Sequence, residues 1–216
     1  MKNYKYPTTF GRRRGKKRLS IPKYKINLEK FSFNLNTKEE IILDIGSGNG
    51  ESTINLSTLN KNKIIIACEV YIDGNVSLIN KIIKNDINNI RIYNKSCFLL
   101  LEKLYDKSIN EAWILYPDPW PKKKHNKRRI ICNLFLKMLN SVLKDMGNVY
   151  VVTDNQDYFS HILYEFKASS FFTWENDTAP YWENSFDIMP QTSYFLKAQK
   201  NCQKSYFMKF KKIPWK

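Results

Sequence analysis

Short runs of consecutive apolar residues recur between positions 41 and 152, separated by polar turns and by stretches with helical periodicity. Apolar, β-branched runs that do not alternate with polar residues are typical of strands covered on both faces of a sheet. Strands that alternate with helices at this spacing predict βαβ units and a mostly parallel sheet. The expected strands are residues 41–45, 63–68, 90–93, 112–116 and 148–152, and the expected helices are residues 51–59, 75–84, 98–105 and 128–144.

The two ends of the chain differ from this central part. The first forty residues are polar and basic, so we expect an arm (1–40) followed by one domain (41–216). Beyond residue 170 the pattern changes to two aromatic, β-rich segments, 171–174 and 205–210. We expect these two segments to pair antiparallel and to close one edge of the sheet.

The charge of the chain indicates the kind of partner. Lys and Arg number 36 while Asp and Glu number 20, which gives a formal net charge of +16. A strongly basic domain is typical of proteins that bind a polyanion such as a nucleic acid. No apolar run approaches the roughly 20 residues that a membrane-spanning helix needs, so we expect no membrane partner.

The cysteines indicate the compartment. Cys68, Cys97, Cys132 and Cys202 are far apart and show no CxxC or Cys/His spacing, so we expect reduced thiols and no metal site. Cys132 is expected in the core, on the apolar face of helix 128–144. The N-terminus has no apolar segment of a secretory signal. We expect a cytoplasmic protein or, as the alternative, an organellar one whose targeting leader is absent from this chain.

A glycine-rich turn follows the first expected strand. It runs from Asp44 to Gly50 with the sequence DIGSGNG, and Glu69 ends the next strand. Parallel open sheets bind ligands at the carboxyl ends of their strands, where glycines let a ligand approach the backbone closely. A carboxylate at Glu69 has two acceptor oxygens, which suit the two hydroxyls of a ribose.

Two cofactor classes use such a turn, and a plain glycine-rich strand-to-helix connection is the alternative to both. The dinucleotide fingerprint needs a small third residue and a pyrophosphate at the helix N-terminus. Glu51 stands at that position, and it is too bulky and carries the wrong charge. The spacing G-x-G-x-G after Asp44 instead resembles the first motif of class I S-adenosylmethionine methyltransferases.

A second motif follows the fourth expected strand. Residues 116–129 read YPDPWPKKKHNKRR, so prolines stand on both sides of Asp118 and a basic cluster comes after it. Prolines fix the backbone and remove competing N–H donors. We therefore expect a stiffly held carboxylate at the sheet edge, next to lysines and arginines placed to meet phosphates.

This run resembles the PDPWxKxxHxKRR signature of the tRNA (guanine-N7-)-methyltransferase family, in its bacterial-type single-chain branch. The resemblance extends to the basic segment 10–16, to Asp44–Gly46, to Glu69–Val70, to 153–154 and to 192–194. It implies a Rossmann-like class I methyltransferase fold, with a seven-stranded, mostly parallel sheet, an antiparallel C-terminal strand and helices on both faces. It also implies methyl transfer from S-adenosylmethionine to N7 of a tRNA guanine, at position 46 in the variable loop. We expect a monomer or homodimer without an obligatory protein partner.

Residues that match the family's functional positions form two groups. The resemblance implies that the cofactor is bound by Asp44, Gly46, Ser47, Gly48, Glu69, Val70, Ser96, Cys97 and Asp118. It implies that guanine or tRNA is contacted by Lys122, Asp154, Thr192, Ser193, Tyr194 and Phe195. Among all of these, Asp118 matches the residue assigned to the catalytic site.

Two positions depart from the family pattern. Ser96 stands where bacterial-type members have an aspartate at the adenine end of the cofactor, and its hydroxyl can still donate and accept. Phe195 stands where the family has a glutamate, so a carboxylate contact to the guanine or a neighbouring group is missing or supplied elsewhere. These departures concern recognition and leave the expected reaction unchanged.

Two other functions are compatible with these motifs. Amino-methyltransferases carry D/N-P-P-[YFW] after the same strand, whereas here a single proline separates Asp118 from Trp120. A non-catalytic RNA-binding module on the same fold is the other alternative, and Ser96 and Phe195 are the residues that favour it. The retained carboxylates Asp44 and Glu69 favour the enzyme.

Overall fold

The computed structural model describes residues 6, 31 and 39–214. It contains a seven-stranded sheet in the order β3-β2-β1-β4-β5-β7-β6. The strands are β1 (Ile41–Ile45), β2 (Ile64–Cys68), β3 (Ile90–Tyr93), β4 (Ile109–Leu115), β5 (Leu143–Thr153), β6 (Phe172–Trp174) and β7 (Tyr206–Lys212). The predicted arm 1–40 falls almost entirely outside the described residues, so the proposed division into arm and domain stays a prediction.

The strand directions confirm the expected topology. β1 pairs parallel with β2 and β4, β2 with β3, and β4 with β5. β7 runs antiparallel to both β5 and β6. All five residues of β1 and all five of β2 are buried, as expected for strands covered on both faces.

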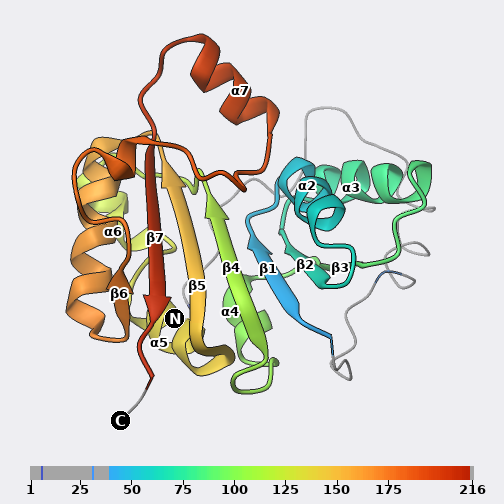
Figure 1. The fold of residues 1–216 in the computed structure, drawn as a ribbon, viewed down its shortest axis with the longest axis horizontal. Coiled ribbons are helices and arrows are strands. Elements are labelled where there is room, and N and C mark those ends of the chain that lie inside the picture. Colours follow the sequence, from blue (N-terminus) through green and yellow to red (C-terminus); the bar gives the residue numbers. More distant parts are fainter. Residues whose placement is uncertain (1–5, 7–30, 32–38, 215–216) are drawn as a thin grey trace.

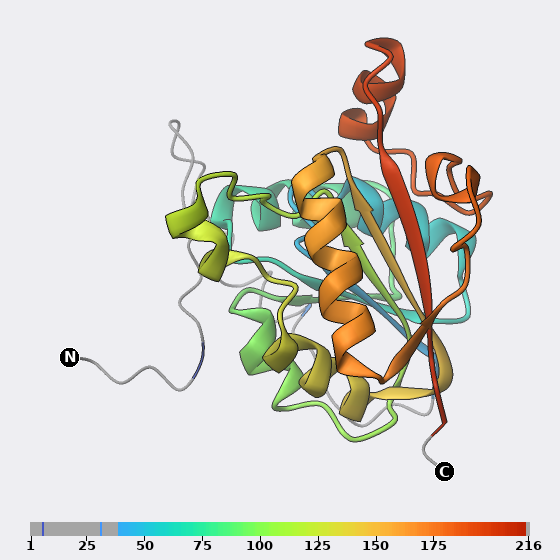
Figure 2. The same ribbon diagram turned by 90° about the vertical axis from the view of Figure 1, so that its left-hand side faces the viewer.

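Helices cover both faces of the sheet (Figures 1 and 2). Leu43 and its neighbours on one face pack in a core with α4 (Cys97–Leu101), α5 (Asn133–Val142) and α6 (Gln156–Ser169). Ile42 and its neighbours on the other face pack with α2 (Glu51–Leu59), α3 (Ile72–Lys84) and α7 (Ser193–Lys200). Figure 1 shows α7 beyond the carboxyl ends of β4 and β5. The α/β fold with an antiparallel C-terminal strand is therefore confirmed.

The helices between β4 and β5 differ from the prediction. A helix was expected over 128–144, but α5 begins only at Asn133, after the 3-10 helix η1 (Lys123–Arg128) and an extended segment. Arg129 is buried and bonds to the preceding loop, which holds this segment out of the helix. Cys132 consequently lies at the N-cap of α5 and is half-buried, so its expected place on the apolar face of the helix was wrong.

Both edges of the sheet are formed by short strands. β6 has three residues and β3 has four, whereas β5 in the interior has eleven. On the outer side of β3, the Ile92 N–H donates to the Phe31 carbonyl at 2.8 Å. Within the described part of the chain no helix combines the length and apolarity that crossing a membrane requires.

Candidate active site

The glycine-rich turn connects β1 to α2 in a left-handed conformation. Gly46, Gly48 and Gly50 have φ values of 78°, 52° and 77°, in the region that favours glycine. A Cβ atom at Gly46 or Gly48 would meet no described atom within 4 Å, so the outer side of the turn is open. On its inner side, a Cβ at Gly74 of α3 would lie 2.2 Å from the Gly48 carbonyl oxygen. The turn therefore packs tightly against α3 and leaves its other side accessible to a ligand.

Asp44 fastens this turn to α2. Its carboxylate is buried and accepts hydrogen bonds from the Ser52 and Thr53 hydroxyls, both at 2.7 Å. Burial raises the pKa of Asp44 to about 6, the two hydroxyls oppose that rise, and nearby Glu69 adds to it. A cationic ligand group beside Asp44 would favour its charged form.

Glu69 joins the end of β2 to the turn and to α3. One carboxylate oxygen accepts from the Gly48 N–H and the other from the Tyr71 N–H, each at 2.9 Å. The amide of Asn75, which is buried in α3, donates to the Glu69 carbonyl at 2.9 Å. Each carboxylate oxygen retains acceptor capacity, so Glu69 can hold the turn and still accept from a ligand.

Two buried serine hydroxyls at the same edge of the sheet have no hydrogen-bond partner among the described residues. Ser47 Oγ lies in the turn after β1, and Ser96 Oγ lies at the N-cap of α4, after β3. Leaving a buried hydroxyl unpaired costs about 1–3 kcal/mol. A ligand with hydroxyl, amine and carboxylate groups, such as S-adenosylmethionine, would give these atoms partners. The residues present fit this cofactor.

The remaining predicted cofactor residues lie beside these groups. Val70 follows Glu69 and is half-exposed, while Cys97 is buried in the first turn of α4. Burial raises the pKa of the Cys97 thiol to about 12, so this cysteine is neutral. Within the described residues no cluster of His, Cys, Asp and Glu could hold a metal ion.

The proline loop after β4 presents Asp118. Tyr116 and Trp120, on either side, have positive φ values of 49° and 44°, which non-glycine residues seldom adopt. Arg129 fixes the loop: its Nε donates to the Pro119 carbonyl at 2.9 Å, and its guanidinium pairs with Asp157 of α6. Asp118 itself is exposed, and within the described part of the chain its carboxylate has no hydrogen-bond or ion-pair partner.

The basic cluster continues from this loop. Lys122, Lys123 and Lys124 are exposed, and the Arg128 guanidinium lies 4.9 Å from the centre of the Trp120 ring. The His125 ring meets the Trp120 ring edge-on, with 5.9 Å between centroids. Desolvation and the surrounding cations hold the pKa of His125 below its ordinary value, so at neutral pH it is an uncharged hydrogen-bonding group.

Asp154 and α7 form the opposite side of this edge. One Asp154 carboxylate oxygen accepts from the Tyr194 hydroxyl at 2.5 Å and from the Gln203 amide at 2.7 Å. The Tyr194 ring lies 4.4 Å from the ring of Tyr116, at the start of the proline loop. Thr192 caps α7 by accepting from the Phe195 N–H at 3.1 Å. The structure thus brings Asp154, Tyr194 and the proline loop together.

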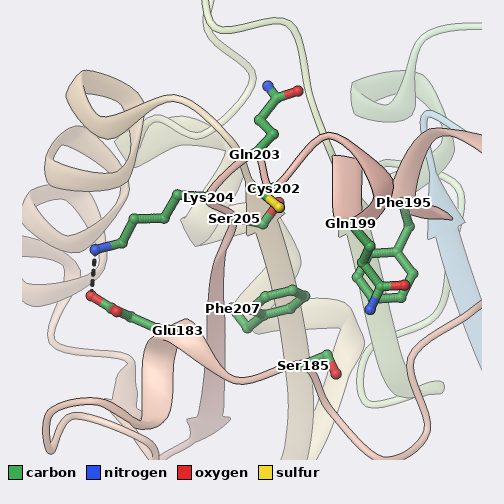
Figure 3. Close-up of a pocket in the computed structure, with 9 residues that line it drawn as sticks. All are labelled: Glu183, Ser185, Phe195, Gln199, Cys202, Gln203, Lys204, Ser205 and Phe207. Atoms are coloured by element: carbon green, nitrogen blue, oxygen red, sulfur yellow. Dashed lines mark ion pairs between the residues drawn. The ribbon is translucent and has the colours of Figure 1, made fainter. Parts of the chain in front are cut away.

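Phe195 is placed differently from these residues. Its side chain is only 3% exposed and packs edge-on against Phe207 of β7. Phe195 lines a hollow of about 310 Å³ together with residues of β7 and η2 (Tyr181–Glu183). Figure 3 shows these side chains and the ion pair between Lys204 and Glu183, whose charged atoms are 2.6 Å apart. Phe195 anchors α7 in the core, and its predicted contact with substrate is untested.

Sequence reasoning missed two of the residues that shape this site. Arg129 was expected among the cations that meet phosphates, yet it is buried and holds the proline loop. Glu51 was considered only as an obstacle to a pyrophosphate, yet it accepts hydrogen bonds from Ser193. The signal for Arg129 was its place inside the signature motif, whereas no local signal existed for Glu51.

Comparison with known proteins also indicates a methyltransferase. The family described as "Putative methyltransferase" matches residues 38–208. The tRNA (guanine-N(7)-)-methyltransferase of Neorickettsia sennetsu is 34% identical over 177 residues, which cover 80% of each chain. The enzyme of that name from Wolbachia pipientis wMel is 32% identical over 216 residues, with 96% of this chain and 93% of the relative covered.

A solved structure resembles the fold. A putative methyltransferase from Streptococcus mutans, determined in complex with SAH, has a TM-score of 0.53 and 13% identity. The similarity covers 88% of this chain and 97% of that one. At this level of identity the likeness concerns the fold alone.

Proposed function

Because this chain belongs to the tRNA (guanine-N(7)-)-methyltransferase family, we propose that it transfers a methyl group from S-adenosylmethionine to N7 of a guanine in tRNA. The observation that carries the proposal is the position of Asp118. Its exposed carboxylate lies in the proline loop after β4, the strand that pairs with β1 and its glycine turn, and the lysine cluster follows this loop in the sequence. A variable-loop guanine, at position 46, is the target that the family resemblance favours.

The cofactor side of the site follows from the groups at the ends of β1, β2 and β3. The chemistry supplied by S-adenosylmethionine, when bound, is an electrophilic methyl group on a cationic sulfur. Asp44 and Glu69 supply negative charge near such a cation, and Glu69 also has acceptor capacity for ribose hydroxyls. Ser47 and Ser96 supply the buried hydroxyls that need partners, with Gly46 and Gly48 giving close backbone access.

The proposed chemistry needs positioning more than proton transfer. Guanine N7 carries an in-plane lone pair and no proton, so no base is required. Holding N7 in line with the methyl group can contribute roughly 7–11 kcal/mol by proximity. Positive charge develops on the guanine ring as it is methylated, and the Asp118 carboxylate would stabilise that charge. The same carboxylate can accept from guanine N1–H and N2–H and orient the ring.

The RNA side is the second half of the proposal. Lys122 and the exposed lysines after it present cations to phosphates, and Trp120 offers an aromatic face beside them. Asp154, Thr192, Ser193 and Tyr194 line the other flank of the same edge. We also propose a cytoplasmic location, with an organelle as the alternative. The four free cysteines support a reducing compartment.

Nucleoside analysis tests this proposal. Unmodified tRNA is incubated with the protein and labelled S-adenosylmethionine, then digested to nucleosides. We expect the label in 7-methylguanosine, and substitution of the target guanine by adenine should abolish it. Label in N6-methyladenosine would instead establish an amino-methyltransferase. Absence of methylation combined with tRNA binding, and no thermal stabilisation by the cofactor, would establish a non-catalytic RNA-binding module.

A further inference from the structure

Glu51 is the first residue of α2 and directly follows the last glycine of the turn. One of its carboxylate oxygens accepts from the Ser193 hydroxyl at 2.7 Å, and the other accepts from the Ser193 N–H at 2.5 Å. These two residues are 142 positions apart in the sequence. Partial burial raises the pKa of Glu51. The hydrogen bonds from Ser193 and the positive charge of nearby Lys81 lower it by more, so the pKa of Glu51 stays below its ordinary value.

The segment that Glu51 holds has few buried residues. Figures 1 and 2 show α7 projecting away from the sheet. Among its eight residues only Phe195 and Ala198 are buried, and a hollow lies between α7 and η2 (Figure 3). Besides Phe195 in the core, the N-terminal end of α7 is held by the Tyr194 ring against Tyr116 and by polar contacts, with Glu51 on the α2 side and Asp154 on the β5 side.

The glycine turn is coupled to the same region. The Lys81 ammonium donates to the Asn49 carbonyl at 2.8 Å, and the Glu69 carboxylate accepts from the Gly48 N–H. Glu51 follows Gly50 directly, so a change in the turn reorients the first residue of α2. Glu51 therefore links the cofactor turn to the segment that carries Thr192 and Tyr194.

We propose that Glu51 is a positioning residue that couples the cofactor turn to the tRNA side of the site. It fixes Ser193, and through Ser193 it sets Tyr194 against Asp154 and the proline loop. This inference rests on the proposed function for its consequence in catalysis. Its structural part, the coupling of the turn to α7, does not depend on which nucleotide is methylated.

The test compares three variants with the wild-type protein. Glu51→Ala removes both acceptors, whereas Glu51→Gln can accept from the Ser193 N–H and donate to the Ser193 hydroxyl, so it should restore the contact without the charge. Glu165→Ala removes a glutamate from α6, on the other face of the sheet, and serves as the matched control. Thermal unfolding is measured for each variant to show that the fold is intact.

Hydrogen exchange reports the coupling without reference to activity. In Glu51→Ala the peptide covering 190–199 should exchange about tenfold faster, as expected for loss of hydrogen bonds to a charged group, while the β1 and β5 peptides remain protected. S-adenosylmethionine should slow exchange of the 190–199 peptide in the wild type, in Glu51→Gln and in Glu165→Ala, but not in Glu51→Ala. Equal exchange of this peptide in Glu51→Ala and the wild type would overturn the proposal.

Kinetics then assign the role. We expect Glu51→Ala to raise the KM for tRNA about tenfold, while the dissociation constant of S-adenosylmethionine changes less than about twofold. Glu51→Gln should lie near the wild type. If Glu51→Gln is as impaired as Glu51→Ala and cofactor binding is abolished in both, the carboxylate acts on the cofactor by charge and the positioning role is wrong. A wild-type protein that makes no 7-methylguanosine, yet shows the exchange pattern above, would refute the proposed function and leave the coupling established.

Discussion

The proposed cofactor side and the proposed RNA side of this site are built differently. On the cofactor side the carboxylates already have partners, since Asp44 accepts from two hydroxyls and Glu69 from two backbone N–H groups. On the RNA side Asp118 is exposed without a partner among the described residues, and Lys122 and its neighbours face solvent. In the first region the carboxylates are already hydrogen-bonded, whereas the second presents charges that have no partner in the described part of the chain, for a group that arrives with the substrate.

The largest effect is expected from the exposed carboxylate. Asp118→Asn keeps the shape and removes the charge, so kcat should fall by about 10²–10³, as for loss of one preorganised electrostatic group. The dissociation constant of S-adenosylmethionine, followed by thermal shift, should stay nearly unchanged. The rate should also remain low at high pH, because the reaction includes no proton removal that hydroxide could carry out in place of Asp118. Turnover close to wild type would show that Asp118 is not the catalytic carboxylate.

Asp44 gives the second prediction, which concerns pH. Its pKa is about 6 in the folded protein against 3.8 ordinarily, so the folded state binds the proton more tightly. The contribution of Asp44 to the free energy of unfolding should therefore fall as pH rises from about 4 to 6, by roughly 2–3 kcal/mol in total. Asp44→Asn can retain both hydroxyl bonds through its amide oxygen and should lack this slope. Denaturant unfolding of both proteins across this pH range measures the difference, and parallel curves would contradict it.

Substitution of Glu69 tests the proposed cofactor side. Glu69→Ala removes a charged acceptor that serves both the turn and the ligand, and such bonds contribute about 1.5–3 kcal/mol. The KM for S-adenosylmethionine should rise about tenfold or more, while kcat at saturating cofactor falls much less. Initial rates at varied cofactor concentration measure both quantities. A loss confined to kcat would place Glu69 in the chemical step and would contradict its assignment to cofactor binding.

The smallest effect is expected from removing two of the exposed cations of the basic cluster. Replacing Lys124 and Lys127 together by alanine should lower the salt dependence of tRNA binding by about 0.7–0.9 for each phosphate that is no longer neutralised. Binding titrations between low and moderate salt give that slope. The double variant of Lys61 and Lys84, at the amino edge of the sheet, is the matched control. If both double variants show the wild-type slope, the cluster does not contact phosphates.

The same comparison explains what the sequence could predict. β1 and β2 were predictable because strands buried on both faces leave uninterrupted apolar runs, and parallel strands bring Asp44 and Glu69 to one edge. α6 was not predicted, although Tyr158, Ile162 and Phe166 stand at helical spacing and form its buried face. The exposed Tyr164 is the one aromatic residue on the opposite side of this helix.

The site was predictable where its residues follow a strand end and not where two distant segments meet. Asp118 and Asp154 each follow a strand of the sheet, so the fold alone places them. The bond between Glu51 and Ser193 and the pair between Arg129 and Asp157 depend on how α7 and α6 pack, which no local pattern records. Phe195 illustrates the same point, since its burial depends on how α7 packs against Phe207 of β7.

The short edge strands have a consequence for solubility. The interior strands β1 and β2 are composed almost entirely of aliphatic residues, and such segments self-associate when their backbones are open to another chain. In the folded protein they are enclosed by neighbours, and the outermost strands offer only four residues in β3 and three in β6. The Ile92 N–H on the outer side of β3 is already bonded to Phe31. Aggregation by strand addition therefore requires prior unfolding, so it should track the stability of the sheet rather than the concentration of the native protein.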